Sequence, residues 1–233
     1  GKYIERITRL NVPIDSTMAS DLITQSIPDE EPPELFRKSK VTDIILVIDG
    51  KKLHFGKYPL AQSSDVFTQM IENSADQSKL QIDDVAYEDM IMFLECLHPQ
   101  KLQTITDTNL EKVLRIAKKF RHEGILLKCE QYILDEFDAA RDTKDGMYGK
   151  FFFHLKLAER FGLERVLNVG ISSKQLEKAY FSCQRFAWNY SPPTVTGYEN
   201  NKYFCQLSSE TKMKILVNRL KAAERKIDRT NPY

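Results

Sequence analysis

Two short stretches carry residue types that could do chemistry, and the first is "GKKLHFGKY", residues 50–58. Glycines followed by a lysine are typical of the loop that binds phosphates in nucleotide hydrolases. That loop has four residues between its glycines, and a Ser or Thr after its lysine holds Mg²⁺. Here five residues separate Gly50 from Gly56, and Tyr58 follows Lys57. The segment therefore fits the second half of a β-hairpin better than a nucleotide site.

The second stretch is Cys96-x-His98, because Cys and His are the usual protein ligands of Zn²⁺. A zinc site needs a second pair at similar spacing, and none accompanies this one. Neighbouring acids at 83–84 and 88–89 fall at turns and helix starts, where capping explains them. The other histidines are scattered: His54, His122 and His154. We predict no catalytic residue, metal or cofactor, and hence a protein that is not an enzyme.

Composition limits the classes of partner. The 233 residues include 34 Lys and Arg and 33 Asp and Glu, a net charge of +1, which argues against a protein dominated by phosphate or membrane-surface contacts. No apolar run approaches the length of a membrane span, and the start of the chain lacks a signal-peptide pattern. Four cysteines without paired spacing indicate reduced thiols in an intracellular protein, cytoplasmic or nuclear: Cys96, Cys129, Cys183 and Cys205.

Charge is unevenly distributed between the two ends. Residues 10–36 hold six acids and no Lys or Arg, with Pro32-Pro33 among them, so we predict an extended acidic arm over residues 1–34. Residues 201–233 hold eight bases and three acids. A nucleic-acid-binding helix is one interpretation of the basic end. Because its bases alternate with acids and with an apolar stripe, we favour a solvated amphipathic helix capped by Ser208.

Between these ends, the pattern predicts a small sheet among helices. "TDIILVIDGKKLHF" predicts a hairpin whose turn is Asp49-Gly50, because a two-residue turn needs positive φ at both central residues. Apolar periodicity and capping residues then predict a short helix opened by Pro59, a helix capped by Ser64, a strand over 80–83 and a helix over 86–98. Thr106 is expected to cap the next helix and Gly124 to end it.

One stretch occurs twice. "LRIAKKFRHEGILLKC" (114–129) matches "LKLAERFGLERVLNVG" (155–170), with Leu, Ala, Phe, Glu and Leu identical at corresponding places. We interpret both as helical hairpins that stack on one another, with Ala117 and Ala158 at close helix crossings and Phe120 and Phe161 in the core beside them. Chance similarity between two amphipathic hairpins is the alternative.

The order of these motifs resembles the BTB/POZ domain. That family's pattern begins with an Asp before an apolar strand, here Asp43, and passes through a hairpin to a basic residue, here Lys57. A Leu-Ala step (60–61) and a Ser-x-x-Phe helix (64–67) follow, and the pattern ends with "LRIAKKF" and a Cys-Glu pair (129–130). The resemblance implies an α+β BTB/POZ fold, a helical cluster flanked by a short mixed sheet.

The second hairpin resembles the helical extension that follows many BTB domains. We therefore predict an acidic arm over 1–34, a BTB/POZ domain over 35–135 and an all-α extension over 136–233. The resemblance implies work in protein–protein interaction, with no nucleic acid and no membrane as partner.

Two partners follow from the resemblance. BTB domains commonly homodimerise through the helix before the first strand, and the implied dimer interface comprises Leu35, Phe36, Asp43 and Lys57. Folding of Leu35 and Phe36 back onto their own chain is the alternative. Many BTB proteins also bind the N-terminal domain of cullin-3 and bring a client to a ubiquitin ligase. The implied cullin-binding surface comprises Met70, Ile71, Ala75, Asp76, Gln77, Leu97 and His98.

The chain departs from the family pattern in three places. Gly56 stands where a His usually precedes the basic residue, and Leu97-His98-Pro99 replaces a frequent Tyr-Thr-Gly. The loop of cullin-binding members carries an apolar residue, any residue and then Glu, whereas this chain has Ala75-Asp76-Gln77. These departures support a second hypothesis, a scaffold that self-associates without binding a cullin. The client protein stays unknown under both hypotheses.

Overall fold

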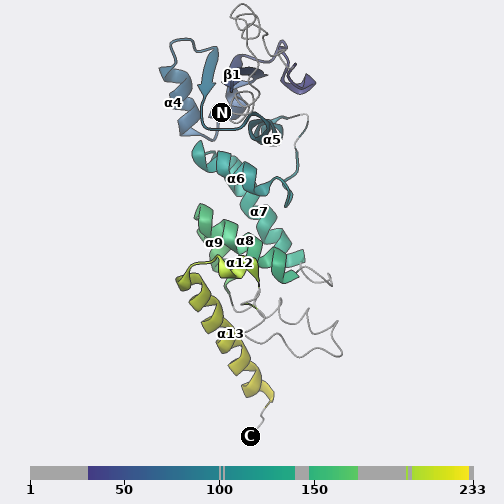
Figure 1. Ribbon diagram of the computed structural model, residues 1–233, viewed down its shortest axis with the longest axis vertical. Helices are drawn as coiled ribbons and strands as arrows, with labels where there is room; N and C mark the ends of the chain where they lie inside the picture. Colours follow the sequence, from purple (N-terminus) through teal and green to yellow (C-terminus); the bar gives the residue numbers. More distant parts are fainter. Residues whose placement is uncertain are drawn as a thin grey trace, which may run out of the picture.

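The computed structural model describes residues 31–99, 101, 103–139, 147–172, 198 and 201–230. The sheet lies at one end of an elongated molecule, stacked helices form the middle, and helix α13 extends to the other end (Figure 1). Nearly all of the predicted acidic arm lies outside the described residues. None of the described helices combines the length and hydropathy of a membrane span.

The sheet has three strands in the order β2-β1-β3. Strands β1 (Ile44–Ile48) and β2 (Lys51–Phe55) form the predicted antiparallel hairpin. Its turn residues, Asp49 and Gly50, have φ angles of 51° and 79°, as a two-residue turn requires. Strand β3 (Lys79–Ile82) lies parallel to β1, so the sheet is mixed, as expected.

Several helices belong to the same part of the molecule as the sheet. Their bounds are η1, a 3₁₀ turn (Glu34–Phe36), α3 (Lys57–Ala61), α4 (Asp65–Asn73), α5 (Tyr87–Leu97) and α6 (Leu110–Lys119). Ser64 caps α4, as predicted: its hydroxyl accepts from the Phe67 N–H at 3.1 Å and donates to the Phe120 carbonyl. The rings of Phe67 and Phe120 stack with centroids 4.3 Å apart. Ser64, Phe67 and Phe120 together therefore join α4 to the end of α6.

Two predicted helix boundaries are wrong. Thr106 does not cap α6; the Asn109 side chain accepts from the Thr106 N–H at 2.8 Å, and the helix begins after this turn. Gly124 does not end α6 either, because it lies in the first turn of α7 (Glu123–Ala139). The residue that breaks the helix is Arg121, with φ of 47°. The residue that adopts the left-handed conformation after a helix is most often Gly, so the sequence did not indicate that Arg121 ends α6.

The repeat is confirmed as two helical hairpins. Helices α8 (Met147–Phe161) and α9 (Glu164–Gly170) form the second, in which α8 packs on α6 and α9 on α7. Arg121 and Gly162 occupy corresponding places in the two turns, both with positive φ. The next N–H in each turn bonds to the carbonyl five residues earlier, that of Ala117 or Ala158, at 2.8 Å.

The alanines and phenylalanines of the repeat are not equally buried. Ala117 and Ala158 are fully buried at the helix crossings. Phe120 is 2% exposed, but Phe161 is only half-buried. The expectation that both phenylalanines belong to the core therefore holds fully for Phe120, whereas Phe161 packs on the core from its edge.

The C-terminal end is helical in its described part. Helix α12 (Lys202–Cys205) packs on α8, and α13 (Ser209–Thr230) runs from there to the end of the molecule opposite the sheet (Figure 1). Ser208 caps α13 as predicted, accepting from the Thr211 N–H at 3.1 Å. Glu159 of α8 accepts from both Ser208 and Thr211 and so fixes the start of α13. The predicted fold class, α+β followed by a helical extension, is confirmed. The predicted domain boundary at 135/136 falls inside α7 and stays a prediction.

Candidate protein-interaction site

A groove of about 1050 Å³ opens at the sheet end of the molecule. It lies between the η1 segment, the end of β2 and the end of α5. The lining side chains include Leu35, Arg37, Lys38, His54, His98 and Lys101. Sequence reasoning had singled out Leu35 and His98 for two different surfaces, and the structure brings both to one groove.

Phe36 lies behind this groove, inside the chain's own core. Its side chain is fully buried, and its ring lies 6.2 Å from Phe55 and 6.5 Å from His98, centroid to centroid. Phe55 and His98 meet edge-on at 6.0 Å, so three rings hold η1 against the sheet. In this arrangement Phe36 has no surface to offer a partner, and only half-buried Leu35 is available for the predicted dimer contact.

The two charged residues of the predicted dimer interface meet elsewhere. An oxygen of the Asp43 carboxylate accepts from the backbone N–H of Lys57 at 2.6 Å. This bond joins the start of β1 to the first turn of α3, where an anion is favoured. Asp43 is exposed and Lys57 half-buried, and neither lines the groove.

The groove combines uncharged imidazoles with cations. Burial lowers the pKa of His98, and burial with nearby Lys38 lowers the pKa of His54, so both rings are neutral at pH 7. Lys101 pairs with Glu95 at the rim of the groove. Neutral imidazoles and partly paired cations beside apolar Leu35 and Phe55 suit a peptide segment.

The loop after α4 has a fixed shape. Ser74 donates to the carbonyls of Asp76 and Lys79 at 2.8 and 3.0 Å. The Asp76 carboxylate accepts from the N–H and hydroxyl of Ser78, and these bonds lower its pKa. Ala75 and Gln77 are thereby left exposed. The implied cullin-binding surface has seven residues, and five of them lie here: the three loop residues 75–77 follow half-buried Met70 and Ile71 at the end of α4.

The remaining two, Leu97 and His98, lie on another part of the domain. His98 packs on Phe55 of β2, whereas the loop leads into β3, and β1 separates these two edges of the sheet. Adjacent strands are about 4.8 Å apart, so the two edges are about 10 Å apart. The seven residues therefore form two patches at one end of the sheet.

The sulfur of the Cys-x-His pair faces the core. Burial raises the pKa of Cys96 to about 11 and that of Cys129 to about 12, so both thiols are protonated at pH 7. His98 is engaged with aromatic rings instead of a metal-ligand set. Among the residues that the structure describes, no three His, Cys, Asp or Glu side chains gather where they could hold a metal ion.

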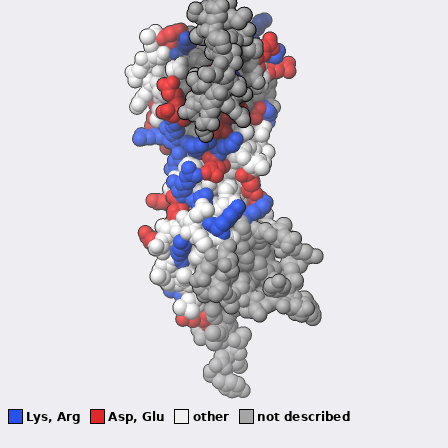
Figure 2. Space-filling model, viewed as in Figure 1, with Lys and Arg blue, Asp and Glu red and all other residues white. Residues whose placement is uncertain are grey.

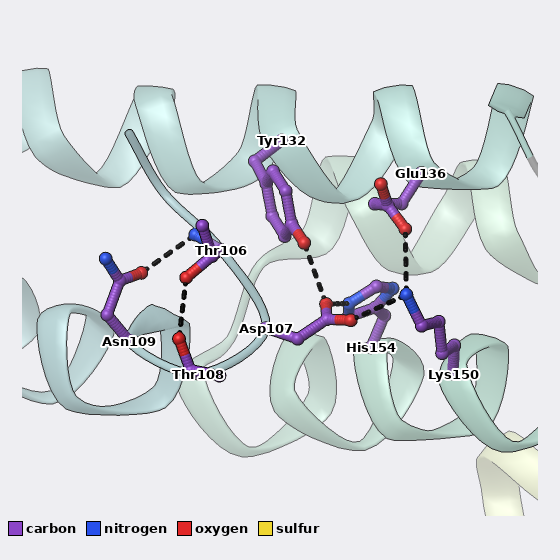
Figure 3. Close-up of polar contacts among 8 residues, drawn as sticks. All are labelled: Thr106, Asp107, Thr108, Asn109, Tyr132, Glu136, Lys150 and His154. Carbon is purple, nitrogen blue, oxygen red and sulfur yellow. Dashed lines mark hydrogen bonds and ion pairs between the residues drawn. The ribbon is translucent and has the colours of Figure 1, made fainter. Parts of the chain in front are cut away.

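A polar joint, of which His154 is the buried member, connects the sheet-bearing part to the extension (Figure 3). Asp107, in the turn before α6, accepts from the Tyr132 hydroxyl of α7 at 2.8 Å and from His154 Nε2 of α8 at 2.9 Å. Lys150 of α8 lies 2.9 Å from the second carboxylate oxygen and 3.8 Å from Glu136 of α7. We call Asp107, Tyr132, Glu136, Lys150 and His154 the polar joint.

In the polar joint, Asp107 is ionised and His154 is neutral at pH 7. Burial alone would raise the pKa of the Asp107 carboxyl, but the three donors outweigh it and lower that pKa from 3.8 to about 2. His154 is 1% exposed, and burial lowers its pKa despite the nearby carboxylate. Because an ionised carboxylate only accepts, the neutral imidazole carries its proton on Nε2. Sequence reasoning missed this joint, since its members lie far apart in the chain and share no motif.

Basic side chains gather over the middle of the molecule, at the level of α6 (Figure 2). On α6, Arg115, Lys118 and Lys119 are exposed. Arg115 and Lys112 both pair with Asp89 of α5, which is 8% exposed. These two cations of α6 therefore form ion pairs that hold α6 against α5.

Comparison with known proteins gives this architecture a family. Residues 33–136 match the model of the BTB/POZ domain. This segment is a BTB/POZ domain. It spans η1, the sheet and helices α3 to α7, so the groove and the exposed loop belong to the domain. The BTB/POZ domain is a protein-interaction module, and the extension beginning at α8 follows it.

Several proteins of Caenorhabditis elegans resemble the chain. "BTB and MATH domain-containing protein 36" is 33% identical over 143 residues, 60% of this chain and 41% of that protein. "BTB/POZ domain-containing protein Y57A10B.3" is 30% identical over 145 residues, which are 59% of this chain and 42% of that protein. The chain thus spans about two fifths of the length of these curated relatives. The chain is also similar to the solved BTB domain of human gigaxonin. That match covers 52% of this chain and 95% of the gigaxonin chain, with 17% sequence identity and a TM-score of 0.35.

Proposed function

We propose that this chain is a homodimeric substrate adaptor of a cullin-3 ubiquitin ligase. In this role the BTB/POZ domain binds the N-terminal domain of cullin-3, and a region outside the domain holds an unknown client protein. The activity places the chain in the cytoplasm or nucleus. The observation that supports cullin binding is the surface formed by the end of α4 and the loop after it.

That surface has the features a helical partner needs. Met70 and Ile71 are half-buried and packed on the core, so their exposed parts are held in place. The adjoining loop is fixed by its own hydrogen bonds and presents Ala75 and Gln77 outward. A preformed apolar patch beside a rigid polar loop binds with a small loss of conformational entropy.

Gln77 gives the sharpest test of cullin binding. The resemblance expects Glu at this place, and a hydrogen bond to a charged group contributes about 1.5–3 kcal/mol. Gln77→Glu should therefore tighten binding of the cullin-3 N-terminal domain by about 10- to 100-fold. Isothermal titration measures this, with Gln81→Glu on the exposed face of β3 as the matched control. If wild type and Gln77→Glu both fail to bind while folded, the adaptor function is wrong.

Self-association is proposed through the groove at the sheet end. Leu35 lines the groove and is half-buried, beside rings that hold η1 in place. Leu35→Asp should convert a dimer to a monomer in light scattering at low protein concentration, because an unpaired charge would enter an apolar contact. Leu127→Asp, at a 57% exposed site on α7, is the control and should stay dimeric. Equal masses for wild type and Leu35→Asp would place the dimer contact elsewhere.

A BTB scaffold that does not bind a cullin is the second candidate. Small Ala75 and uncharged Gln77 favour it, since both weaken the contacts that a cullin would make. This function predicts dimeric protein that binds no cullin-3 in either the wild-type or the Gln77→Glu form. The same titration and light scattering therefore separate the two candidates.

A further inference from the structure

The described part of the chain begins at the groove of the sheet end. The groove lining includes Pro33 and Glu34, which lead into η1. Glu31, the first described residue, pairs at 2.7 Å with Arg37 of the lining, and Arg37 also donates to the Pro32 carbonyl at 3.4 Å. The chain that precedes Glu31 therefore joins the fold at the rim of the groove.

One end of the groove has an excess of positive charge. Burial lowers the pKa of His54, and Lys38 of the lining and nearby Lys52 lower it further. Both lysines are exposed, and within the described chain no carboxylate is among the groups that shift this pKa. The other two cations of the lining already have acidic partners. An anionic segment would therefore be favoured beside His54.

The acidic arm supplies such a segment next to the rim. Residues 10–30 hold four acids and no Lys or Arg, and they lie outside the described residues. Asp29 and Glu30 directly precede Glu31, and Ile27 stands two positions before Asp29. A chain spans about 3.5 Å per residue, so Asp29 is within about 7 Å of Glu31 along the chain and Ile27 within about 14 Å. Carboxylates and an apolar side chain are thus both within reach of the groove.

We propose that residues 27–30 occupy the groove of their own chain. The carboxylates of Asp29 and Glu30 then face the lysines beside His54, and Ile27 covers the apolar lining at Leu35. The groove volume of about 1050 Å³ is at the upper end of small-molecule sites, so it suits a segment of several residues. Attachment at the rim selects this occupant over a second copy, because a short tether gives an effective concentration on the order of millimolar.

Occupation of the groove gives the acidic arm a regulatory role. Residues 27–30 would cover Leu35, which is the proposed dimer contact, so the closed monomer and the dimer exclude each other. This regulatory consequence rests on the proposed function. The occupation itself does not, because it needs neither a cullin nor a second copy.

Titration of His54 in the full chain tests the charge contact. Asp29→Lys/Glu30→Lys should lower the pKa of His54 by about half a unit or more, because two carboxylates near the imidazole become two cations. Asp15→Lys/Asp21→Lys makes the same change of charge farther along the arm and should move it by less than about 0.2 of a unit. Nuclear magnetic resonance of the imidazole measures both. Equal shifts from the two double variants, or no shift from the first, would overturn the proposal.

A neutral variant separates a segment bound in the groove from one that is only tethered nearby. Ile27→Gln changes no charge, but it removes the apolar contact, so the carboxylates should leave the groove and the pKa of His54 should fall. Ile23→Gln is the matched control and should leave that pKa unchanged. An unchanged pKa in Ile27→Gln would overturn the proposal, as would a wild-type pKa that rises with protein concentration, which would assign the groove to the arm of a second copy.

Sedimentation over a concentration series tests the regulatory role. Asp29→Lys/Glu30→Lys should lower the dissociation constant of self-association by about tenfold, because it removes the closed monomer that competes with the dimer. Asp15→Lys/Asp21→Lys should leave that constant unchanged. Identical constants would overturn the regulatory role. Absence of any dimer in all three proteins would instead contradict the proposed self-association, and the titration of His54 would still decide whether the groove is occupied.

Discussion

Replacing Asp107 by Ala tests whether the polar joint stabilises the fold. The imidazole of His154 is 1% exposed, so its Nε2–H would lose its acceptor where water cannot replace it. A buried donor left unpaired costs about 1–3 kcal/mol. Tyr132 is half-buried and Lys150 is 60% exposed, so water can bind both and they add little. We expect Asp107→Ala to lower the free energy of unfolding by about 2–3 kcal/mol.

Urea unfolding at pH 7, followed by circular dichroism, measures this loss. For a chain of this size it corresponds to a fall in Tm of about 5–10 °C. Asp135→Ala is the matched control, because its carboxylate is exposed and accepts from Gln131 one turn away, so its loss should cost less than about 0.5 kcal/mol. A loss below about 1 kcal/mol for Asp107→Ala would refute the claim that water is excluded from His154.

The pH dependence of the polar joint follows from two pKa shifts. The pKa of Asp107 falls from 3.8 to about 2 on folding, so its contribution is full above about pH 4 and is lost between pH 4 and 2. The pKa of His154 is also lowered, so its contribution is full above its ordinary pKa of 6.5 and decreases as pH falls below that value. The stability difference between wild type and Asp107→Ala should therefore shrink as pH falls from 4 to 2. A difference that stays constant across that range would contradict the assignment.

Three further substitutions test the helical hairpins by urea unfolding. Gly170→Ala would place a Cβ 2.6 Å from a methyl of buried Leu155, and the overpacking should cost about 1–3 kcal/mol; unchanged stability would mean that the neighbours move easily. Arg121→Gly should stabilise the fold by about 0.5–1 kcal/mol because φ is 47° there, and a loss instead would reveal a contact of the Arg side chain. Phe120→Ala should cost about 3–5 kcal/mol and half-buried Phe161→Ala clearly less; equal costs would contradict their different burial.

The elements that sequence predicted correctly are those with a strong local signal. Asp49-Gly50 fixed the hairpin because few other dipeptides tolerate two positive φ angles. Ser64 and Ser208 were recognised as caps because each precedes an apolar periodic run. The repeat was found because matched helix crossings need small residues at the same spacing. These signals act over a few residues, and the sequence contains them directly.

The misses have two physical origins, which are competing local turns and contacts distant in sequence. Asn109 displaced Thr106 as the residue before α6, and Arg121 took the left-handed conformation in place of Gly124. Phe36 looked like an interface residue, but its ring is buried against Phe55 and His98. The first two misses are local turns, whereas Phe36 is held by residues distant in sequence.

The polar joint was beyond prediction for the same reason. Tyr132 follows Asp107 by 25 residues, and His154 follows it by 47. Only the stacking of α8 on α6 and α7 brings them together. The two patches of the implied cullin-binding surface were likewise separated by strand order, which sequence periodicity does not encode.

Helix α7 also determines how two bound proteins would be oriented. It runs for 17 residues, about 25 Å, and α9 packs on it while α8 packs on α6. Asp107 bonds to α7 and α8 at the same time, so the extension is attached sideways to two helices of the BTB/POZ domain. A protein bound at the sheet end and one bound on α8 or α9 would therefore be held at a constant angle to each other.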